Sequence, residues 1–296
     1  MDRFFLSTIL GVVFGVSVRF IMLRSDYRQY PGYPHGFITH LSLGFIASVL
    51  GALAVPVFAE REIPAIAFLS LAATQFRDIR EIERKTLISL DMSNLVPRGP
   101  DYIEGIARVF EARNYLVMFT AMVVSGINYA SSLMFSIPFG FLAMLISRYL
   151  MRGRVIGDIA VIRPGEVYFK GPNVFVEGIQ FMNLARSEVH QKIMERSLGV
   201  VIEPNDDNAR SILGNNGQRM AIAHDASIQL GIYKDIDTAE FTPILRRDLD
   251  TGRIAMLITP LEPDMDCLLA AVRRVPVLET SVSRPLQSRA GRGAAD

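Results

Sequence analysis

The feature that most constrains this chain is a stretch without a single charged side chain, which runs from Tyr115 to Ser147. Its length of about 33 residues exceeds the roughly 20 that one membrane-spanning helix needs. A polar segment, Asn128-Tyr129-Ala130-Ser131-Ser132, stands near its middle and is a natural place for a turn. The stretch therefore predicts a tight hairpin of two short membrane spans, Tyr115–Ile127 and Leu133–Leu150.

Two further apolar segments precede this hairpin. Phe4–Leu23 is apolar except for Arg19, and Phe37–Phe58 contains no charged residue. A cleaved signal peptide is the alternative for the first segment, but no small-x-small cleavage site separates it from the polar residues that follow. We therefore expect two retained membrane helices, in agreement with a composition in which half of the residues are apolar and 21% are charged.

The segment Ile63–Phe76 is ambiguous, because 14 residues are few for a bilayer about 30 Å thick. It is a short span, a re-entrant helix or a packed core helix. Arg77–Ser89 continues from it as an amphipathic helix with a solvated charged face and a Glu81–Lys85 pair. Val96–Pro100 then forms a turn. A further helix is predicted from Asp101, its N-cap, to Asn114.

Basic residues define the expected topology, since Lys and Arg gather on the cytoplasmic side of membrane proteins. Residues 77–114 and the segment after Arg148 are rich in arginine, whereas the hairpin tip has no charge. Both regions are therefore expected in the cytoplasm of a multi-pass membrane protein. Five spans would also place Arg19, Arg24 and Arg28 on the cytoplasmic side, and we favour five. The shortness of Ile63–Phe76 favours four.

After Gly157 the apolar residues occur in short runs that alternate with turn residues. The fold class predicted is thus a membrane α-helical bundle of four or five spans followed by a small cytoplasmic α/β domain. We expect a transmembrane domain over residues 1–154, with a cytoplasmic helical loop at 77–114. A soluble α/β domain follows at 155–280, and a disordered tail at 281–296. The strands expected are Asp158–Ile162, Glu166–Phe169, Val174–Val176, Leu198–Ile202 and Arg253–Ile258; the helices are Ala185–Ser197, Asn205–Tyr233 and Asp264–Arg274.

The sequence offers no enzyme motif of a known kind, and we expect no cofactor, no metal and no catalytic residue. The net charge of +1 argues against nucleic-acid binding. Cys267, the single cysteine, is expected in the core, and Asp206-Asp207 at a helix start. His190 is expected on a solvent-exposed helix face. His40, near the start of a span, is either a proton-relay or ligand group or an interfacial histidine that reaches lipid headgroups; we favour the second.

Two segments are candidate interaction surfaces. The loop between the first two spans combines three tyrosines with prolines and glycines, which suits an aromatic belt at the membrane interface or a contact with a partner or headgroup. The segment Pro97–Tyr115 holds a glycine inside a predicted helix, which indicates close approach of another group or ordinary helix packing. The candidate residues are Tyr27, Arg28, Tyr30, Tyr33, His35, Tyr102, Glu104, Gly105, Glu111 and Arg113.

The hexapeptide Tyr102-Ile103-Glu104-Gly105-Ile106-Ala107 resembles the signature of the YIEGIA protein family. The segments Tyr27–Gly36, Gly199–Arg210 and Glu240–Ile254 also resemble that family, so the likeness covers most of residues 1–280. The resemblance implies a polytopic membrane protein of endospore-forming bacteria, associated with sporulation and assembly of the spore envelope. It implies no molecular activity and no catalytic residue.

Three functions are compatible with these observations. The first, which we favour, is a structural or scaffolding membrane protein that recruits spore-assembly or membrane proteins through its cytoplasmic domain. The second is a component of a small-solute or ion transport system, for which only Arg19 and His40 lie within the apolar spans. The third is a membrane-embedded enzyme acting on lipid-linked substrates, with Tyr102, Glu104, Glu111 and Arg28 as its polar group. Glu104 and Glu111 are seven residues apart and share a helix face.

Overall fold

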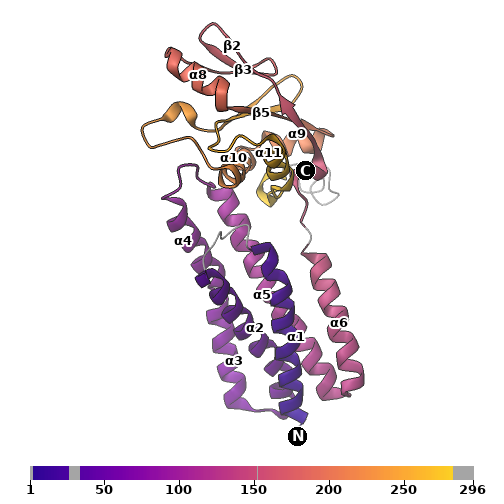
Figure 1. Cartoon of the computed structure of the whole chain (residues 1–296). Helices are drawn as coiled ribbons and strands as arrows, with labels where there is room; N and C mark the ends of the chain where they lie inside the picture. Colours follow the sequence, from indigo (N-terminus) through magenta and orange to yellow (C-terminus); the bar gives the residue numbers. More distant parts are fainter. Residues whose placement is uncertain (1–2, 27–33, 152, 283–296) are drawn as a thin grey trace, which may run out of the picture. The chain divides into compact units, whose positions relative to one another are not determined.

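The computed structural model describes residues 3–26, 34–151 and 153–282 (Figure 1). They form two compact units. The helical unit comprises the described residues of 1–86 and 106–152, and the α/β unit comprises those of 87–105 and 153–296. The division differs from the expected one at residues 87–105, which pack with the α/β unit. The expected tail at 281–296 lies almost entirely outside the described residues.

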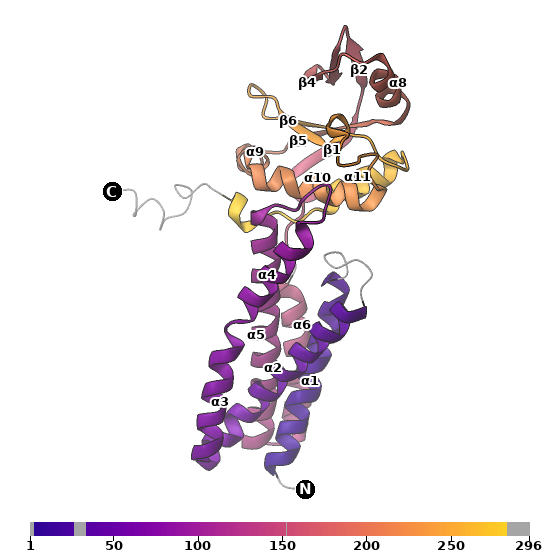
Figure 2. The ribbon, with the colours of Figure 1, turned by 90° about the vertical axis from the view of Figure 1, so that its left-hand side faces the viewer.

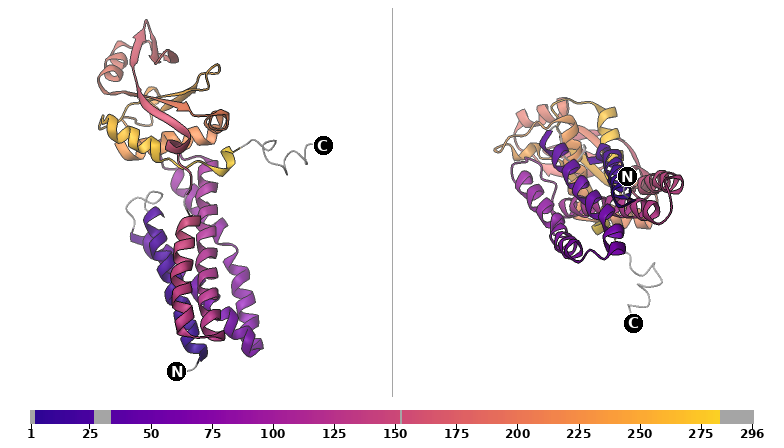
Figure 3. Two further views of the ribbon diagram at one scale, coloured as in Figure 1. Left: turned by 90° about the vertical axis from the view of Figure 1, so that its right-hand side faces the viewer. Right: turned by 90° about the horizontal axis from the view of Figure 1, so that it is seen from below.

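The helical unit is a bundle in which α1 packs against α2 and α6, and α2 packs against α3 (Figures 1 and 3). Two of its helices, α4 and α5, continue across the boundary into the α/β unit. The helices are α1 (Arg3–Asp26), α2 (Pro34–Glu60), α3 (Ile63–Phe76), α4 (Ile79–Asp91), α5 (Pro100–Ala130) and α6 (Leu133–Leu150).

Glycines bring the helices of the bundle into backbone contact. A Cβ atom at Gly11 would lie 2.7 Å from the carbonyl oxygen of Ala121 on α5. At Gly15 it would lie 2.5 Å from Oγ of Ser48 on α2. At Gly51 it would overlap the carbonyl oxygen of Met118. The Gly11–Gly15 spacing thus permits close helix contact.

The outer surface of the bundle is apolar. In the described part of the chain, three helices are long and apolar enough to cross a membrane, namely Arg3–Leu23, Gly36–Glu60 and Leu133–Leu150. A continuous apolar surface of this kind is disfavoured in water, so it indicates association with a membrane. Exposed large side chains on it include Phe5, Phe20, Phe45, Phe68, Phe141 and Leu145. Whether α3 and α5 also cross, giving four or five spans in total, stays a prediction.

The helix boundaries differ from the expected ones at three places. The helix predicted from Asp101 and the span predicted from Tyr115 form one 31-residue helix, α5. It begins at Pro100, whose missing N–H makes it well suited to a first helical turn, so Asp101 is not the N-cap. A turn at Arg77–Asp78 separates α3 from α4. The hairpin turn at Ser131-Ser132 is where the sequence placed it.

The α/β unit contains two antiparallel sheets. The larger has the strand order β1-β5-β7-β6 and the smaller has the order β2-β3-β4. Their strands are β1 (Ala160–Gly165), β2 (Val167–Lys170), β3 (Asn173–Val176), β4 (Ile179–Asn183), β5 (Leu198–Pro204), β6 (Ile244–Arg247) and β7 (Ile254–Ile258). The helices are α7 (Ile156–Ile159), α8 (Ser187–Arg196), α9 (Asp207–Gly214), α10 (Asn216–Leu230) and α11 (Met265–Arg274), with single 3-10 turns at Ala239–Phe241 and Glu279–Ser281.

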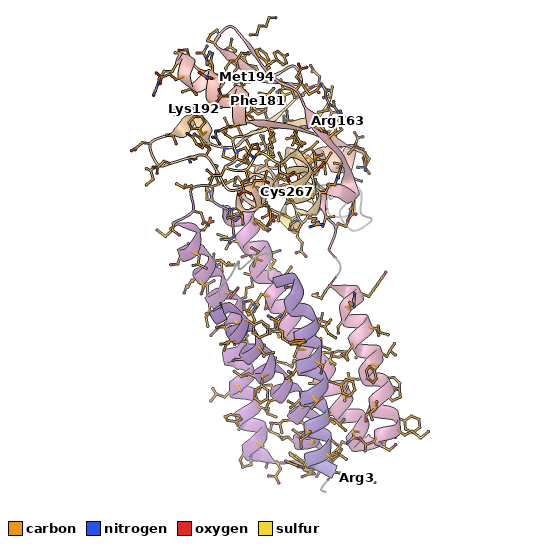
Figure 4. The ribbon with its side chains drawn as sticks, in the orientation of Figure 1. Arg3, Arg163, Phe181, Lys192, Met194 and Cys267 are labelled. Carbon is orange, nitrogen blue, oxygen red and sulfur yellow. The ribbon has the colours of Figure 1, made fainter. Side chains whose placement is uncertain are left out.

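The central strand β7 is buried at all five positions because the larger sheet is covered on both faces. Figure 2 shows α10 and α11 on one face and the smaller sheet with α8 on the other. Ala255 and Leu257 belong to a core shared with Val174, Phe181 and Ile193. Phe181 lies close to α8 (Figure 4). A strand buried on both faces appears in the sequence as an unbroken apolar run, as Ile254–Ile258 does.

The sequence predicted β1, β2, β3, β5 and β7 and the three main helical segments, but it missed β4 and β6. The β3–β4 hairpin turns at Glu177-Gly178, where both residues have positive φ (49° and 83°). That turn type normally carries Asn or Asp before the glycine. Because Glu177 stands there instead, the sequence did not indicate the turn. Asp206 is the expected N-cap, and it accepts a bond from the N–H of Ala209 (2.7 Å). Cys267 on α11 was expected in the core, but it is only half-buried (Figure 4).

The connection between α4 and α5 is built into the α/β unit. Asp91 accepts the backbone N–H of Arg98 (2.8 Å) and closes the loop. His224 Nδ1 lies 2.7 Å from the carbonyl oxygen of Val96. The hydroxyl of Tyr102 donates to the carboxylate of Asp225 at 3.0 Å. The first residue of the Tyr102–Ala107 hexapeptide therefore joins the start of α5 to α10.

Replacing Tyr102 by phenylalanine is expected to lower the free energy of unfolding of the α/β unit by about 1 to 2 kcal/mol. The side chain is buried and its partner is a carboxylate, so the substitution removes a charge-assisted hydrogen bond from a shielded position. Thermal unfolding of the purified full-length protein, followed by circular dichroism, measures the change. Tyr168→Phe is the control, since Tyr168 stacks on Phe175 through its ring. Equal effects of the two substitutions would contradict the prediction.

Candidate functional site

The helical unit holds a fully buried arginine on α1. Arg19 is 0% exposed, and its Nε donates to the backbone carbonyl of His40 on α2 (3.1 Å). Its Nη2 lies 2.8 Å from Nδ1 of the same histidine. Because a guanidinium group can only donate, Nδ1 must accept, and the proton of a neutral His40 is therefore on Nε2.

The neighbouring helices are shaped around this arginine. A Cβ atom at Gly44 would overlap the side chain of Arg19, so only glycine leaves room there. Phe110 of α5 lies beneath the guanidinium at 5.4 Å and against the ring of His40 at 4.8 Å. A desolvated cation over an aromatic face gains about 2 kcal/mol, which offsets part of the cost of burying Arg19.

Three more buried polar residues belong to this region. Glu83 on α4 is 8% exposed, and Arg113 and Asn114 on α5 are 6% and 0% exposed. The charge of Arg19 attracts Glu83 and repels Arg113. Oε1 of Glu83 and Oδ1 of Asn114 have no hydrogen-bond partner within the described residues. We call Arg19, His40, Glu83, Arg113 and Asn114 the charged centre.

The charged centre combines two guanidinium groups with one carboxyl group and a neutral imidazole. Burial raises the pKa of Glu83 to about 7, although the charge of Arg19 acts in the opposite direction. The formal charge of the group is therefore +1 when Glu83 is ionised and +2 when it is protonated. Such a centre can exchange a proton near neutral pH or compensate a small anion. Ionisable groups placed among membrane helices usually serve functions of this kind.

The raised pKa of Glu83 predicts that stability falls with rising pH. In the unfolded chain the carboxyl group ionises near 4.5, whereas in the folded protein it stays protonated until about 7. The stabilising effect of the retained proton is full below pH 4.5 and is lost as the pH rises through 7, by up to about 3 kcal/mol. Unfolding of wild type and Glu83→Gln between pH 5 and 8 tests this prediction. The variant should lack this part of the pH dependence, and parallel curves would contradict it.

Sequence reasoning placed two of these residues wrongly. His40 was expected at lipid headgroups, but it is 4% exposed and bonded to Arg19. The charges of α4 were expected on a solvated face, which holds for the Glu81–Lys85 pair (3.6 Å) but not for Glu83. The spacing of Ile79, Glu83 and Leu87 could have indicated the burial of Glu83. Each residue lies about one turn from the next, so the three share one helix face, and all three are buried.

The other candidate residues are distributed over both units. Arg113 belongs to the charged centre, and Glu111 pairs with Arg80 at 3.8 Å. Tyr102, Glu104 and Gly105 belong to the α/β unit. A Cβ atom at Gly105 would meet only Leu278, at 3.8 Å, which is ordinary packing. Of the polar group considered for an enzyme, Tyr102 and Glu104 thus belong to one unit and Glu111 to the other, and Arg28 lies outside the described residues.

The loop candidates Tyr27, Arg28, Tyr30 and Tyr33 lie outside the described residues, and His35 lies in the first turn of α2. His190 is half-buried instead of solvent-exposed: its ring stacks on Phe169 at 4.1 Å. Among the residues that the structure covers, no three His, Cys, Asp or Glu side chains are grouped to hold a metal ion.

Comparisons with known proteins point to one family. A family model described as "YIEGIA protein" matches residues 7–288. A protein of Bacillus subtilis (strain 168), named "Uncharacterized protein YphB", is 39% identical over 287 residues, which cover 97% of each chain. No solved structure matches.

Proposed function

The chain belongs to the YIEGIA protein family, and from this premise we propose that it is a multi-pass membrane protein with a scaffolding role in spore-envelope assembly. Its α/β unit would lie in the cytoplasm and recruit membrane or spore-assembly proteins. The homologous protein comes from Bacillus subtilis, an endospore former. This setting agrees with the membrane character of the helical unit.

One observation carries this proposal: the connection between α4 and α5 folds together with the region after α6. The described residues of 87–105 and 153–296 form one unit, with hydrogen bonds from Tyr102 to Asp225 and from Lys234 to the carbonyl of Leu95. This shared unit supports a topology in which the two segments lie on the same side of a membrane. In this proposal α5 and α6 together cross it and return. The arginines of these segments then make that side the cytoplasm.

The turn between α2 and α3 supports five crossings. The hydroxyl of Tyr129, close to the α5–α6 hairpin, donates to Glu60 at the end of α2 (3.2 Å). The α2–α3 turn thus lies at the same end of the bundle as the hairpin. From there α3 leads back toward α4, as Figure 1 shows. In the proposed topology α3 is the third of five spans.

Cysteine labelling tests this topology in intact cells. In a Cys267→Ala background, which removes the single cysteine, Arg61→Cys should react with a membrane-impermeant maleimide if α3 crosses. Arg61 is exposed between α2 and α3. Ser131→Cys at the hairpin should react too, whereas Lys170→Cys in the α/β unit should react only after lysis. Labelling of Lys170→Cys in intact cells would overturn the proposed orientation.

The scaffolding role is tested by crosslinking the full-length protein in sporulating cells, followed by affinity capture and mass spectrometry. A reproducible set of spore-envelope or membrane proteins supports it. The specific variant is Tyr102→Phe, which should weaken capture in proportion to unfolding of the α/β unit. Capture of the protein alone, at good yield, would overturn it.

The charged centre favours a second function, the movement of a small ion or solute across the membrane. We propose it as the alternative because four ionisable side chains lie buried in the helical unit, where the sequence suggested two. Proteoliposomes with an internal pH indicator test for proton or anion flux. Glu83→Gln should abolish a flux that Glu111→Gln, at a half-buried ion pair with Arg80, leaves unchanged. Absence of flux in wild type would remove this alternative.

A further inference from the structure

Two arginines of the α/β unit lie close to each other, and neither forms a salt bridge with an acid in the described part of the chain. Arg219 is in the first turns of α10, and Arg247 ends β6, an edge strand of the larger sheet. The guanidinium group of Arg247 lies against the junction of α9 and α10, since Nη1 would be 2.8 Å from a Cβ atom at Gly214. Both side chains are half-buried, and the Nε atom of each is shielded from solvent.

Neither Nε atom has a hydrogen-bond partner within the described residues. Burial and the charge of Arg247 both lower the pKa of Arg219, so the two guanidinium groups are close enough to repel each other. Asp101 lies against Gly217 nearby, but it forms no ion pair with Arg219 among the described residues. Other arginines of this unit have acids beside them: Arg163 pairs with Glu177 and Glu203, and Arg253 with Asp248.

A pair of like charges with buried unsatisfied donors is unfavourable unless something compensates it. An oxyanion would accept hydrogen bonds from both guanidinium groups and cancel their repulsion. Arginine forks match the oxygens of phosphate closely. The positive end of the α10 dipole adds to the attraction, because Arg219 lies near the start of this helix.

We propose that Arg219 and Arg247 form a binding site for a phosphate-type oxyanion, supplied either by a free phosphate compound or by the headgroup of an anionic phospholipid. Two guanidinium groups compensate the charge of a phosphate dianion, whereas one carboxylate would leave a positive charge in the site. The site lies in the α/β unit and is separate from the charged centre, so it does not depend on the function proposed above.

The test uses the full-length protein in phosphatidylcholine nanodiscs. Calorimetric titration with inorganic phosphate, against chloride at equal ionic strength, measures binding of the free anion. Hydrogen exchange of the amides of residues 214–219 is compared between phosphatidylcholine and phosphatidylglycerol nanodiscs to detect a headgroup. Arg247→Gln and Arg219→Gln are the test variants. Arg246→Gln is the matched control, because Arg246 is the exposed neighbour on the same strand.

Phosphate binding that each test variant weakens at least tenfold, and the control less than twofold, supports the site with a free phosphate source. Slower exchange only with phosphatidylglycerol, lost in the test variants and kept in the control, supports a headgroup. Neither response, or equal losses in control and test variants, overturns the proposal. Both test variants are expected to fold, since each removes one of two repelling charges. Thermal unfolding at or above the wild-type temperature verifies this.

Discussion

Replacing Arg19 by methionine is expected to destabilise the helical unit by about 3 to 5 kcal/mol at pH 8. The substitution removes both hydrogen bonds to His40 and the positive charge that faces Glu83. The buried carboxylate of Glu83 then lacks the charge of Arg19, which favours its ionised form. At pH 6 the effect should be smaller, because Glu83 takes up a proton and the buried group becomes neutral.

The double variant Arg19→Met, Glu83→Gln should recover most of this loss. Exchanging both of two interacting buried charges for uncharged side chains is often neutral or stabilising, whereas removing only one leaves the other less well compensated. With the single variant Glu83→Gln measured as well, the cycle gives the coupling energy between the two residues. A coupling energy below about 0.5 kcal/mol would mean that Arg19 and Glu83 act independently, and this would contradict the interaction proposed for the charged centre.

Unfolding in mixed detergent micelles, followed by circular dichroism, measures these energies. The chain contains no tryptophan, so intrinsic tryptophan fluorescence offers no signal. Arg80→Met is the matched control: Arg80 is 40% exposed and its pair with Glu111 is 3.8 Å long. A partly exposed pair of this kind contributes at most about 1 kcal/mol. A large loss in the control would point to a general effect of arginine removal.

The helical half of the fold was predictable because a membrane span has a strong composition signal. Phe4–Leu23 and Phe37–Phe58 lie inside α1 and α2, and Ile63–Phe76 has the bounds of α3. These helices are apolar on every side, so composition alone reveals them and no 3.6-residue periodicity of apolar residues is required. The continuity of α5 through Tyr115 was missed because the change from charged to apolar residues resembles a boundary. The hydrogen bonds of a helix join backbone groups, so they continue across a change from charged to apolar side chains.

The charged centre was only partly predictable, and the reason is physical. Arg19 and His40 stand out because they interrupt apolar segments, and Arg113 was noted beside the hexapeptide. Glu83 is surrounded by arginine and lysine in the sequence, where local pairs on a solvated face account for every charge. Its burial is decided by how α4 packs in the bundle, and this depends on residues 60 or more positions away, such as Arg19. Local pattern cannot contain that information.

Replacing Gly51 by alanine is expected to destabilise the bundle by about 1 to 3 kcal/mol, and Gly51→Leu by more. The Cβ atom would overlap the carbonyl oxygen of Met118, which belongs to the backbone of α5 and cannot rotate away. Helices α2 and α5 would therefore have to separate along their length. Reduced accumulation in the membrane and a lower unfolding temperature in micelles are the measurements.

The sign of the alanine result decides between two accounts of this glycine. If Gly51 were only a weak point in α2, alanine would stabilise the helix by up to about 1 kcal/mol through its higher helix propensity. Close approach of two backbones predicts the opposite sign. Gly153→Ala is the control, because a Cβ atom at Gly153 meets nothing within 4 Å. A stabilised Gly51→Ala variant would show that α2 and α5 do not meet at Met118, and the packing that buries the charged centre would need revision.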